Sequence, residues 1–453
     1  MANSLAKVDP AWAWNPYHPD ARRPWNRRAA AHLARRAGFG ATWSELEDSV
    51  RRGPRESVQR LFSPSPETAA FETEMDRLAR TVLGGGDPAQ LSAWWFYRIL
   101  KTPRQLVEKT VLFWHGHFAT SAAKVESAAL VYRQHQLLRK HAWGRFEDMV
   151  QGISRDPAML IWLDSTTNRK THPNENYARE LMELFCLGVG AYTEKDIQEI
   201  ARTFTGWEVR RDKFYFTSYR HDRKPKTFLG RTGDFGGEDA VRIVLAQPAA
   251  PRFIARKLIH FFMFDEPSVP DSLLDPLAAQ LRENDFRIQP VLETILGSNL
   301  FFSEHSVARK VRSPVELATG LLRSLEGTFN THRLAESTRE LGQGLFYPPN
   351  VKGWDGGRTW INSSTLLGRA NLARQLALGD EANYGEGGLD GVVEKHGVAQ
   401  PERLVDWLSE LLLAAPLPKD ARSRLVRLAD SNAGSRAGEI VQAISLTPEF
   451  QLG

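Results

Sequence analysis

The stretch THPNENYARELMELFCLGVGAYTEKDIQEIARTFTGW, residues 171–207, decides the fold that we expect for this chain. Asn174 is a helix-capping residue type, and the helix that it starts is expected to run to Leu187, just before a glycine. Thr193, with Asp196 three residues later, resembles a capping box at the start of a second helix. Only the short segment VGAY joins the two helices, so they must pack against each other.

Most of the remaining chain also has a helical period. In the segment after Thr102, for example, the side chains of Val107, Val111, Trp114 and Phe118 fall on one helical face. The period changes after Trp207, where WEVRRDKFYFTSY places a turn-like segment between aromatic residues. We therefore expect a mainly α fold, a large multi-helix body with one small β-hairpin or ribbon near residues 207–230.

Composition and turn signals divide the chain into four parts. Residues 1–24 mix proline, tryptophan and polar residues without a helical period, and are expected to form an irregular arm. Residues 25–378 are expected to form the main helical domain with its small β insertion. The glycine-rich residues 379–399 are expected to form a loop, and residues 400–453 a C-terminal helical portion packed on the main body.

The charge of the chain is only mildly positive, with a formal net charge of +5 at pH 7. The excess is uneven, since ten arginines stand against four acidic residues between Arg22 and Arg60. That segment lacks the interleaved aromatic residues of single-strand binders and any known nucleic-acid-binding motif. Nucleic-acid binding is therefore disfavoured. The arginine-rich faces are expected to be solvated surfaces, with anion or glycan binding as the alternative.

No segment approaches the roughly 18 consecutive apolar residues of a membrane span. The pair Arg35 and Arg36 raises the question of a twin-arginine export signal, but the segment that follows is too short and turns acidic. The single cysteine, Cys186, excludes an internal disulfide and is expected to be a buried small hydrophobe. Because no leader is visible, we expect a cytoplasmic protein, with export alongside a partner as the alternative.

Six short motifs in a fixed order carry a resemblance to one bacterial family. They are RRAGFGAT (35–42), FWHGHFATS (113–121), NENYARELMELFCLG with EIARTFTGW (174–188 and 199–207), KTFLGRTGDFGG (226–237), FIARKL (253–258), and PPNVKGWDGG with TWINSSTLLGR (348–357 and 359–369). Over roughly residues 25–450 the chain resembles the domain of unknown function 1800 family. The resemblance implies a largely helical fold and carries over no catalytic role. Members are often encoded beside a sulfatase-like family exported through the twin-arginine route, which implies a sulfatase-like protein as a partner.

Glu180 and Glu183 form the candidate catalytic carboxylate pair. On a helix that runs from Asn174 to Leu187 they fall on one face. Two carboxylates at i and i+3 can hold a metal ion, or raise the pKa of one carboxyl group for acid/base catalysis. Arg179 lies four residues from Glu183, so an ordinary salt-bridge ladder is the alternative for that residue. Glu180 has no such partner in its own helix.

His117 is the candidate catalytic histidine. It lies near the end of an expected helix, whereas His115 points roughly the other way, so at most one of the two belongs to a site. A histidine hydrogen-bonded at a helix end is the alternative. A divalent metal ion is one option for a cofactor, with His221 and Asp222 as candidate ligands. The sequence has no HExxH, GxSxG or GxGxxG motif that would identify the chemistry.

A loop rich in tryptophan, proline and glycine spans residues 348–364, PPNVKGWDGGRTWINSS, and is called the Trp354 loop below. Trp354, Arg358, Trp360 and Asn362 are its candidate substrate-binding residues, because flat aromatic rings beside planar polar groups suit sugars and polyanions. Since the chain has 13 tryptophans, anchoring of the loop to the core is the alternative.

Two functions from different classes follow from these features. The first is a hydrolase or lyase that acts on a polar polymer, a glycan or peptide, with Glu180, Glu183 and His117 in a cleft lined by the Trp354 loop. The second is a non-catalytic partner of a sulfatase-like exported protein. The sequence leaves open the reaction, the substrate, the metal and the oligomeric state.

Overall fold

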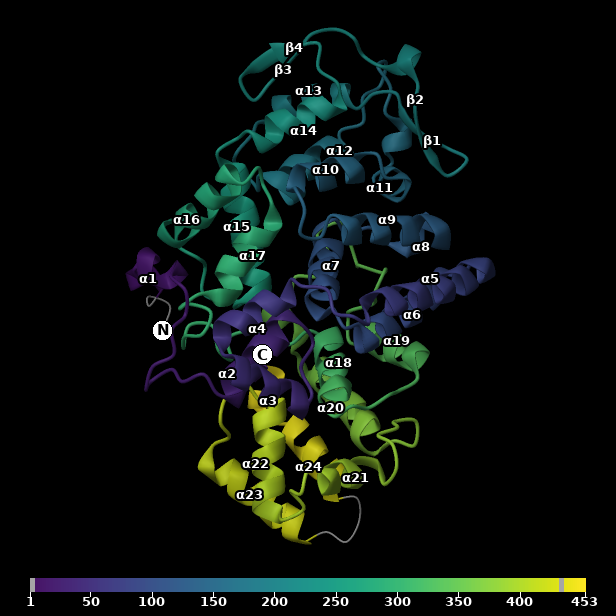
Figure 1. Cartoon of the computed structure of the whole chain (residues 1–453). Helices are drawn as coiled ribbons and strands as arrows, with labels where there is room; N and C mark the ends of the chain where they lie inside the picture. The colour runs from purple at the N-terminus through teal and green to yellow at the C-terminus, as the bar shows by residue number, and fades with distance from the viewer. Residues whose placement is uncertain (1–4, 432–435) are drawn as a thin grey trace.

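The computed structural model describes residues 5–431 and 436–453 of the 453-residue chain. Helices dominate these residues, and the strands among them form two short antiparallel hairpins (Figure 1). The mainly α fold with a small β region is therefore confirmed. The N-terminal helices are α1 (Pro10–Trp14), α2 (Arg27–Ala37), α3 (Trp43–Arg52), α4 (Pro54–Leu61), α5 (Thr68–Gly85) and α6 (Pro88–Lys101).

The middle of the chain supplies the helices around the β region. They are α7 (Gln105–His117), α8 (Ala122–Val125), α9 (Ala128–Lys140), α10 (Phe146–Ser154), α11 (Pro157–Trp162), α12 (Asn176–Glu180), α13 (Glu194–Thr203), α14 (Gly237–Leu245), α15 (Ala249–Phe262), α16 (Asp271–Glu283) and α17 (Ile288–Gly297). The C-terminal helices are α18 (Pro314–Ser324), α19 (Thr331–Glu340), α20 (Ser363–Leu378), α21 (Gly388–Lys395), α22 (Pro401–Leu412), α23 (Lys419–Ser431), α24 (Arg436–Ser445) and α25 (Pro448–Gln451).

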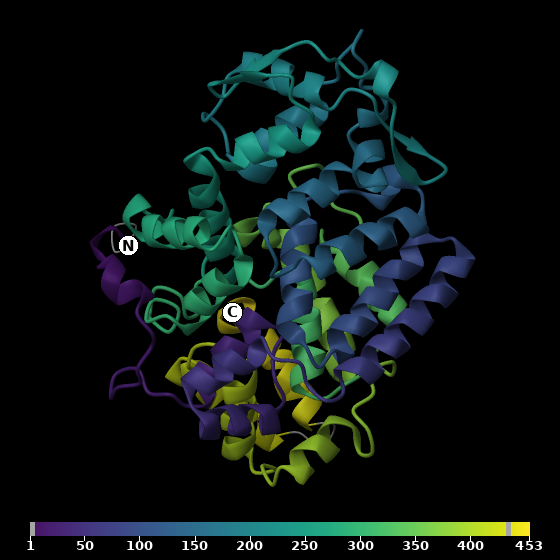
Figure 2. The same cartoon turned by 45° about the horizontal axis from the view of Figure 1, so that its top comes forward.

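The helix α7 lies in the middle of the molecule, between the β region at one end and the C-terminal helices at the other (Figures 1 and 2). It packs against α9 and α2. The predicted stripe of Val107, Val111, Trp114 and Phe118 is buried and belongs to one continuous hydrophobic core. At the far end α22 packs against α2 and α24 against α20, so the C-terminal helices close onto the body.

The helix expected from Asn174 to Leu187 is only partly α-helical. α12 ends at Glu180 and continues as a π-helical segment, Leu181–Cys186, in which the backbone N–H of Leu187 still donates to Met182 O at 2.8 Å. A π-helical turn holds more residues than an α-helical turn, so the α-helical spacing used for Glu180 and Glu183 does not describe this segment. The two carboxyl groups still lie close enough for the charge of Glu183 to raise the pKa of Glu180. The start of the second helix is confirmed, because both hydrogen bonds of the Thr193–Asp196 capping box are present.

The β region contains two hairpins rather than one. β1 (Trp207–Arg210) pairs with β2 (Lys213–Phe216), and β3 (Lys226–Phe228) pairs with β4 (Arg231–Gly233). They lie together at one end of the molecule (Figure 1).

Two stretches expected to lack helices contain short ones. The N-terminal arm contains α1, which Asp9 caps by accepting a hydrogen bond from the Ala11 backbone N–H at 3.0 Å. The glycine-rich residues 379–399 contain α21, which is anchored where Asp390 accepts a hydrogen bond from the Ala437 backbone N–H at 2.8 Å. Both cases show a tertiary or capping contact that outweighs weak helix propensity.

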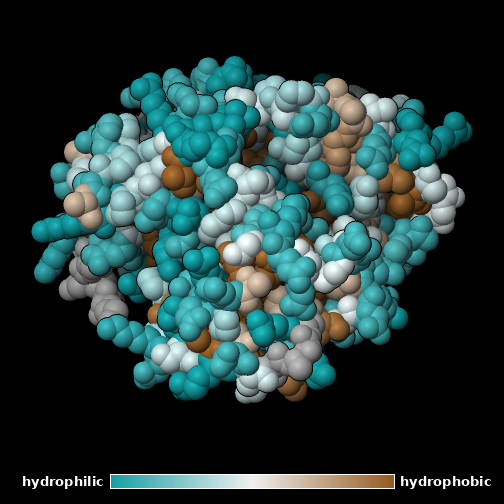
Figure 3. All heavy atoms as spheres, turned by 60° about the horizontal axis from the view of Figure 1, so that its bottom comes forward, coloured by the Kyte–Doolittle hydropathy of each residue, from teal (hydrophilic) through white to brown (hydrophobic). Residues whose placement is uncertain are grey.

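The surface near the C-terminal helices is mostly hydrophilic, and hydrophobic residues appear there as small separate patches (Figure 3). Among the described residues, none of the helices combines the length and the hydropathy that crossing a bilayer requires.

Candidate functional site

A cleft with a volume of about 740 Å³ opens where α7, α15 and the Trp354 loop meet. The segment after the π-helix, Leu187–Val189, forms part of its wall, so the stretch that organises the sequence also reaches the cleft. Its lining includes charged side chains, a histidine and two tryptophans: His117, Arg256, Lys257, Asp265, Glu266, Lys310, Glu316, Lys352, Trp354, Asp355, Arg358 and Trp360.

Two glycines bring the Trp354 loop onto α7. Gly353 has a left-handed backbone, with φ of 79°, and a Cβ atom placed on it would lie 2.2 Å from Gly116 O. A Cβ on Gly116 would in turn lie 3.7 Å from the Trp354 ring. Because the nearest atom to Gly353 is backbone, no side-chain rotation could relieve the clash. The glycines of the FWHGHF and KGW motifs therefore form one contact, and Gly116 and Trp354 beside it both line the cleft.

His117, the last residue of α7, lies in the cleft wall with 5% of its surface exposed. Its Nε2 lies 3.0 Å from Phe185 O, and since a carbonyl only accepts, Nε2 carries the hydrogen. Nδ1 is then an acceptor, and it has no partner among the described residues. Burial lowers the pKa of His117 well below its usual value, and the charge of Lys257 lowers it further. The histidine is neutral and its tautomer is fixed.

Neither of the two predicted catalytic carboxylates lines the cleft. Glu180 is half-buried, and burial raises its pKa, an effect to which the nearby charge of Glu183 adds. Lys352, which lines the cleft, is close enough to lower that pKa in part. Glu183 accepts a hydrogen bond from the Tyr192 hydroxyl at 3.2 Å. The Arg179 guanidinium pairs with Glu194 at 2.8 Å and with Glu175 at 3.2 Å, so the ladder that it forms leaves Glu183 out.

Three of the four predicted substrate-binding residues, Trp354, Arg358 and Trp360, line the same cleft as His117. The indole Nε1 of Trp354 is buried and has no hydrogen-bond partner in the described part of the chain. Asn362 lies outside the lining. It caps α20, where its side chain accepts a hydrogen bond from the Thr365 backbone N–H at 2.9 Å.

The predicted metal ligands lie in the β region and serve local contacts there. His221 Nδ1 lies 2.9 Å from Thr205 O, and Asp222 forms an ion pair of 2.7 Å with the Arg202 guanidinium. Within residues 5–431 and 436–453, no group of three or more His, Cys, Asp and Glu side chains is placed to hold a metal ion. Neither residue lines the cleft.

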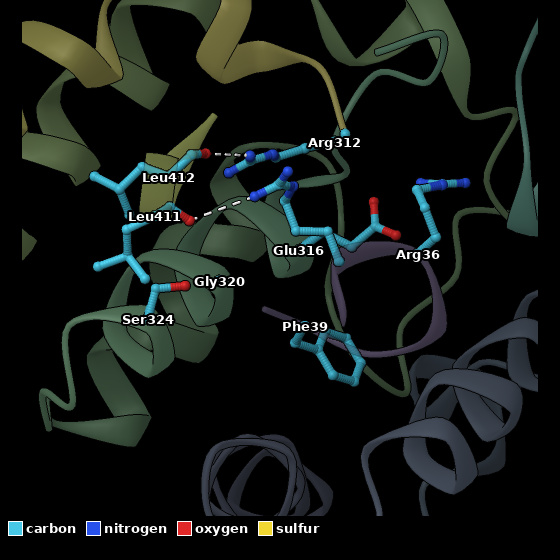
Figure 4. Close-up of a pocket in the computed structure, with 10 residues that line it drawn as sticks. Arg36, Phe39, Arg312, Glu316, Gly320, Ser324, Leu411 and Leu412 are labelled. Atoms are coloured by element: carbon cyan, nitrogen blue, oxygen red, sulfur yellow. Dashed lines mark hydrogen bonds between the residues drawn. The ribbon is translucent and has the colours of Figure 1, made fainter. Parts of the chain in front are cut away.

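A network of buried charges lies beneath the cleft. Glu316, which reaches the cleft from α18, pairs with the Lys109 ammonium at 2.5 Å and accepts a hydrogen bond from the Ser313 backbone N–H at 2.8 Å. Arg36, Arg312 and Glu316 gather around a cavity of about 10 Å³, where Arg312 donates to Leu412 O at 2.7 Å (Figure 4). That cavity has room for about one water molecule and is too small for a larger ligand. We therefore assign the network to the stability of the fold.

Sequence reasoning missed the charged residues of the cleft from α15 and the loop after it. Lys257 comes from α15, and Asp265 pairs with Lys310 at 2.7 Å. The sequence does carry a signal for Lys257 and Lys352, because they lie inside the FIARKL and PPNVKGWDGG motifs. Asp265 and Lys310 stand in no motif, and no local signal in the sequence marks them.

The comparisons with known proteins agree with this arrangement of motifs. The family described as "Protein of unknown function (DUF1800)" matches residues 32–452, nearly the whole chain. The chain therefore belongs to the DUF1800 family. No curated protein and no solved structure matches it.

Proposed function

We propose that the chain binds a polar polymer in the cleft between α7, α15 and the Trp354 loop, and cleaves it as a hydrolase or lyase. The observation that carries the proposal is that candidate site residues far apart in the sequence line the same cleft. His117, Trp354, Arg358 and Trp360 come from motifs more than 200 residues apart in the chain, yet they line one cleft of about 740 Å³. A volume of this size accommodates several sugar rings or amino-acid residues.

The side chains of Glu180 and His117 are of types that suit proton transfer. Burial and the charge of Glu183 raise the pKa of the half-buried Glu180 carboxyl group, which is the direction that suits a general acid for a leaving oxygen or nitrogen. His117 offers a neutral ring whose acceptor, Nδ1, has no hydrogen-bond partner within the described residues. Lys352 relates Glu180 to the cleft, because it lines the cleft and its charge also lowers the pKa of Glu180 in part.

Replacing Glu180 tests the catalytic part of the proposal. The Glu180→Gln variant keeps the size and hydrogen-bonding capacity of the side chain but removes the titratable proton. We expect the release of reducing ends or of new amino termini, measured over a panel of glycans and peptides, to fall by about a hundredfold or more. Glu194→Gln is the matched control, because Glu194 is 70% exposed and pairs only with Arg179 among the described residues. A Glu180→Gln variant that turns over the substrate at the wild-type rate would refute the assignment.

A second candidate function, binding to a sulfatase-like protein, draws support from the β region. Tyr215, Phe216 and Tyr219 expose 48%, 43% and 68% of their surfaces. Exposed aromatic residues close together are typical of protein contacts. Co-purification of the chain with a sulfatase-like protein encoded beside it tests this function. It should weaken when Tyr215 and Tyr219 are replaced by Ser, and it should be unaffected by Glu180→Gln.

A further inference from the structure

We infer that the polymer bound in this cleft is an acidic glycan, and that Lys257 binds its carboxylate or sulfate groups. The inference rests on the proposed function, because it assigns a chemical class to the ligand of the same cleft. Its basis is the balance of charges along the cleft wall.

Most of the charged side chains in the wall already have partners. Lys310 pairs with Asp265 at 2.7 Å, and Arg358 pairs with Glu266 at 2.8 Å. The partners of the others lie outside the cleft, since Glu316 pairs with Lys109 at 2.5 Å and Arg256 faces Asp271 at 3.6 Å. The charges that remain in the wall are Lys257, Lys352 and Asp355, for which no ion pair forms within the described residues.

Lys257 differs from Lys352 in its surroundings. Lys352 is exposed at the margin, where the carboxyl group of Glu180 is near. Lys257 is partly buried, and its Nζ lies 5.4 Å from the centre of the Phe253 ring. Burial lowers the pKa of Lys257, which is the mark of a cation that has lost water without gaining a counter-ion. An anionic group of a ligand would supply the missing counter-charge, and a charge-assisted hydrogen bond formed there is stronger than one in open water.

The neighbours of Lys257 do not supply that charge. His117 is neutral, and its carbonyl-bound tautomer leaves an acceptor that interacts weakly with an ammonium group compared with a carboxylate. The ring of Phe253 offers only a cation–π contact. Within the described residues, therefore, no side chain neutralises the charge of Lys257, and an anionic group of a ligand would do so.

A glycan fits the cleft better than a peptide or a nucleic acid. Peptides that bind in an extended form usually add a strand to the edge of a sheet, and no strand of the described chain lines this cleft. Of the lining charges that form no ion pair within the described residues, Lys257 and Lys352 are cations and Asp355 is an acid, so the wall matches a ligand with one or two anionic groups better than a nucleic acid with a phosphate on every nucleotide. Trp354 and Trp360 provide flat rings of the kind on which sugars pack, and the buried indole N–H of Trp354 has no acceptor in the described part of the chain.

The test uses a short acidic glycan and its uncharged counterpart, digalacturonate and its methyl ester. Binding to the full chain is measured by calorimetry and by tryptophan fluorescence. We expect the acid to bind about tenfold more tightly than the ester or better, and the difference to shrink as salt rises. The Lys257→Met variant should bind both ligands with the weak affinity of the ester. Lys257→Arg should retain most of the preference, and Lys213→Met, an exposed lysine of β2, should leave it unchanged.

The outcomes separate this inference from the function on which it rests. Equal binding of acid and ester by the wild-type chain overturns the inference and leaves the polymer-binding cleft in place. Binding of neither ligand, nor of any neutral glycan or peptide, overturns the proposed function itself. Tighter binding of single-stranded DNA or of an acidic peptide overturns the assignment to glycans. The comparison of acid with ester needs no variant, so a Lys257→Met chain that fails to fold does not block the test.

Discussion

Charged side chains lie around two parts of the helix α7, and they differ in whether they are paired. Along the helix, Glu108 and Lys109 are completely buried, and each has an oppositely charged partner. At its end, where His117 reaches the cleft, the nearby Lys257 is only partly buried and has no acidic partner among the described residues. Matched charges inside the core stabilise one packing of the helices, whereas an unmatched charge in a cleft is available to a ligand.

The paired set is centred on Glu108. Its carboxylate accepts hydrogen bonds from the Arg98 guanidinium at 2.7 Å, the Arg139 guanidinium at 3.0 Å and the Trp95 indole at 3.0 Å. Burial alone would raise the pKa of Glu108, but the charges of Arg98 and Arg139 outweigh it and lower the pKa to about 2. The network joins α6, α7 and α9, so it fixes how these three helices pack.

Breaking this network should have the largest effect on stability. We expect Glu108→Gln to lower the free energy of unfolding by about 3–5 kcal/mol, because it leaves buried guanidinium groups without their full counter-charge. Denaturant unfolding at pH 7 measures the loss. Because the pKa of Glu108 is lowered from 4.5 to about 2 in the folded state, its contribution is present above about pH 4.5 and is lost as the pH falls toward 2. The gap between wild type and variant should therefore narrow in acid.

An exposed ion pair gives the control for this prediction. Asp406 and Arg422 form a pair of 2.7 Å, with side chains that are 57% and 41% exposed. We expect Asp406→Asn to cost no more than about 1 kcal/mol. Equal losses for Asp406→Asn and Glu108→Gln would contradict the view that burial gives the α7 network its strength.

The next largest effect should come from the contact between the Trp354 loop and α7. Gly353→Ala places a Cβ atom 2.2 Å from Gly116 O, and we expect a loss of about 2–3 kcal/mol from strain and overpacking. Gly86→Ala is the matched control, because Gly86 has a similar φ of 70° but open space around it, so it should lose only about 1 kcal/mol. Gly353→Ala should also abolish ligand binding in the cleft, while Gly86→Ala should not. Equal losses of stability for the two variants would show that the loop does not need this close approach.

Much of the fold could be predicted from local patterns, because those patterns act over a few residues. The stripe from Val107 to Phe118 and the capping box at Thr193 follow from helical spacing and from one hydrogen-bond motif. The π-helical segment could not be predicted in this way. Its sequence, LMELFC, has ordinary α-helical propensity, and the burial of Phe185 and Cys186 within it would be equally expected of an α-helix.

The candidate site was predictable only where its chemistry is aromatic or belongs to a motif. Trp354 and Trp360 were noticed because tryptophan is rare and flat, and His117 because it ends a motif helix. Lys257 was not, because in the sequence it is one basic residue of a helix that also carries Arg252 and Arg256. What distinguishes Lys257 is that it has no acidic partner among the described residues, and that depends on which elements pack around α15.

The smallest expected effect on stability also gives the sharpest test of the contrast between the two sets of charges around α7. If Lys257 binds a ligand and does not stabilise the fold, then Lys257→Met should leave the free energy of unfolding within about 0.5 kcal/mol of the wild-type value or raise it. The substitution removes a partly desolvated charge that has no ion-pair partner among the described residues. The same substitution at Lys109, whose ammonium pairs with Glu316, should instead cost several kcal/mol, as Glu108→Gln does. Denaturant unfolding of both variants without ligand, at one pH, measures the difference. If Lys257→Met destabilised the chain as strongly as Lys109→Met, the charge at the cleft would have to be a part of the core network, and the contrast between the two sets of charges around α7 would not hold.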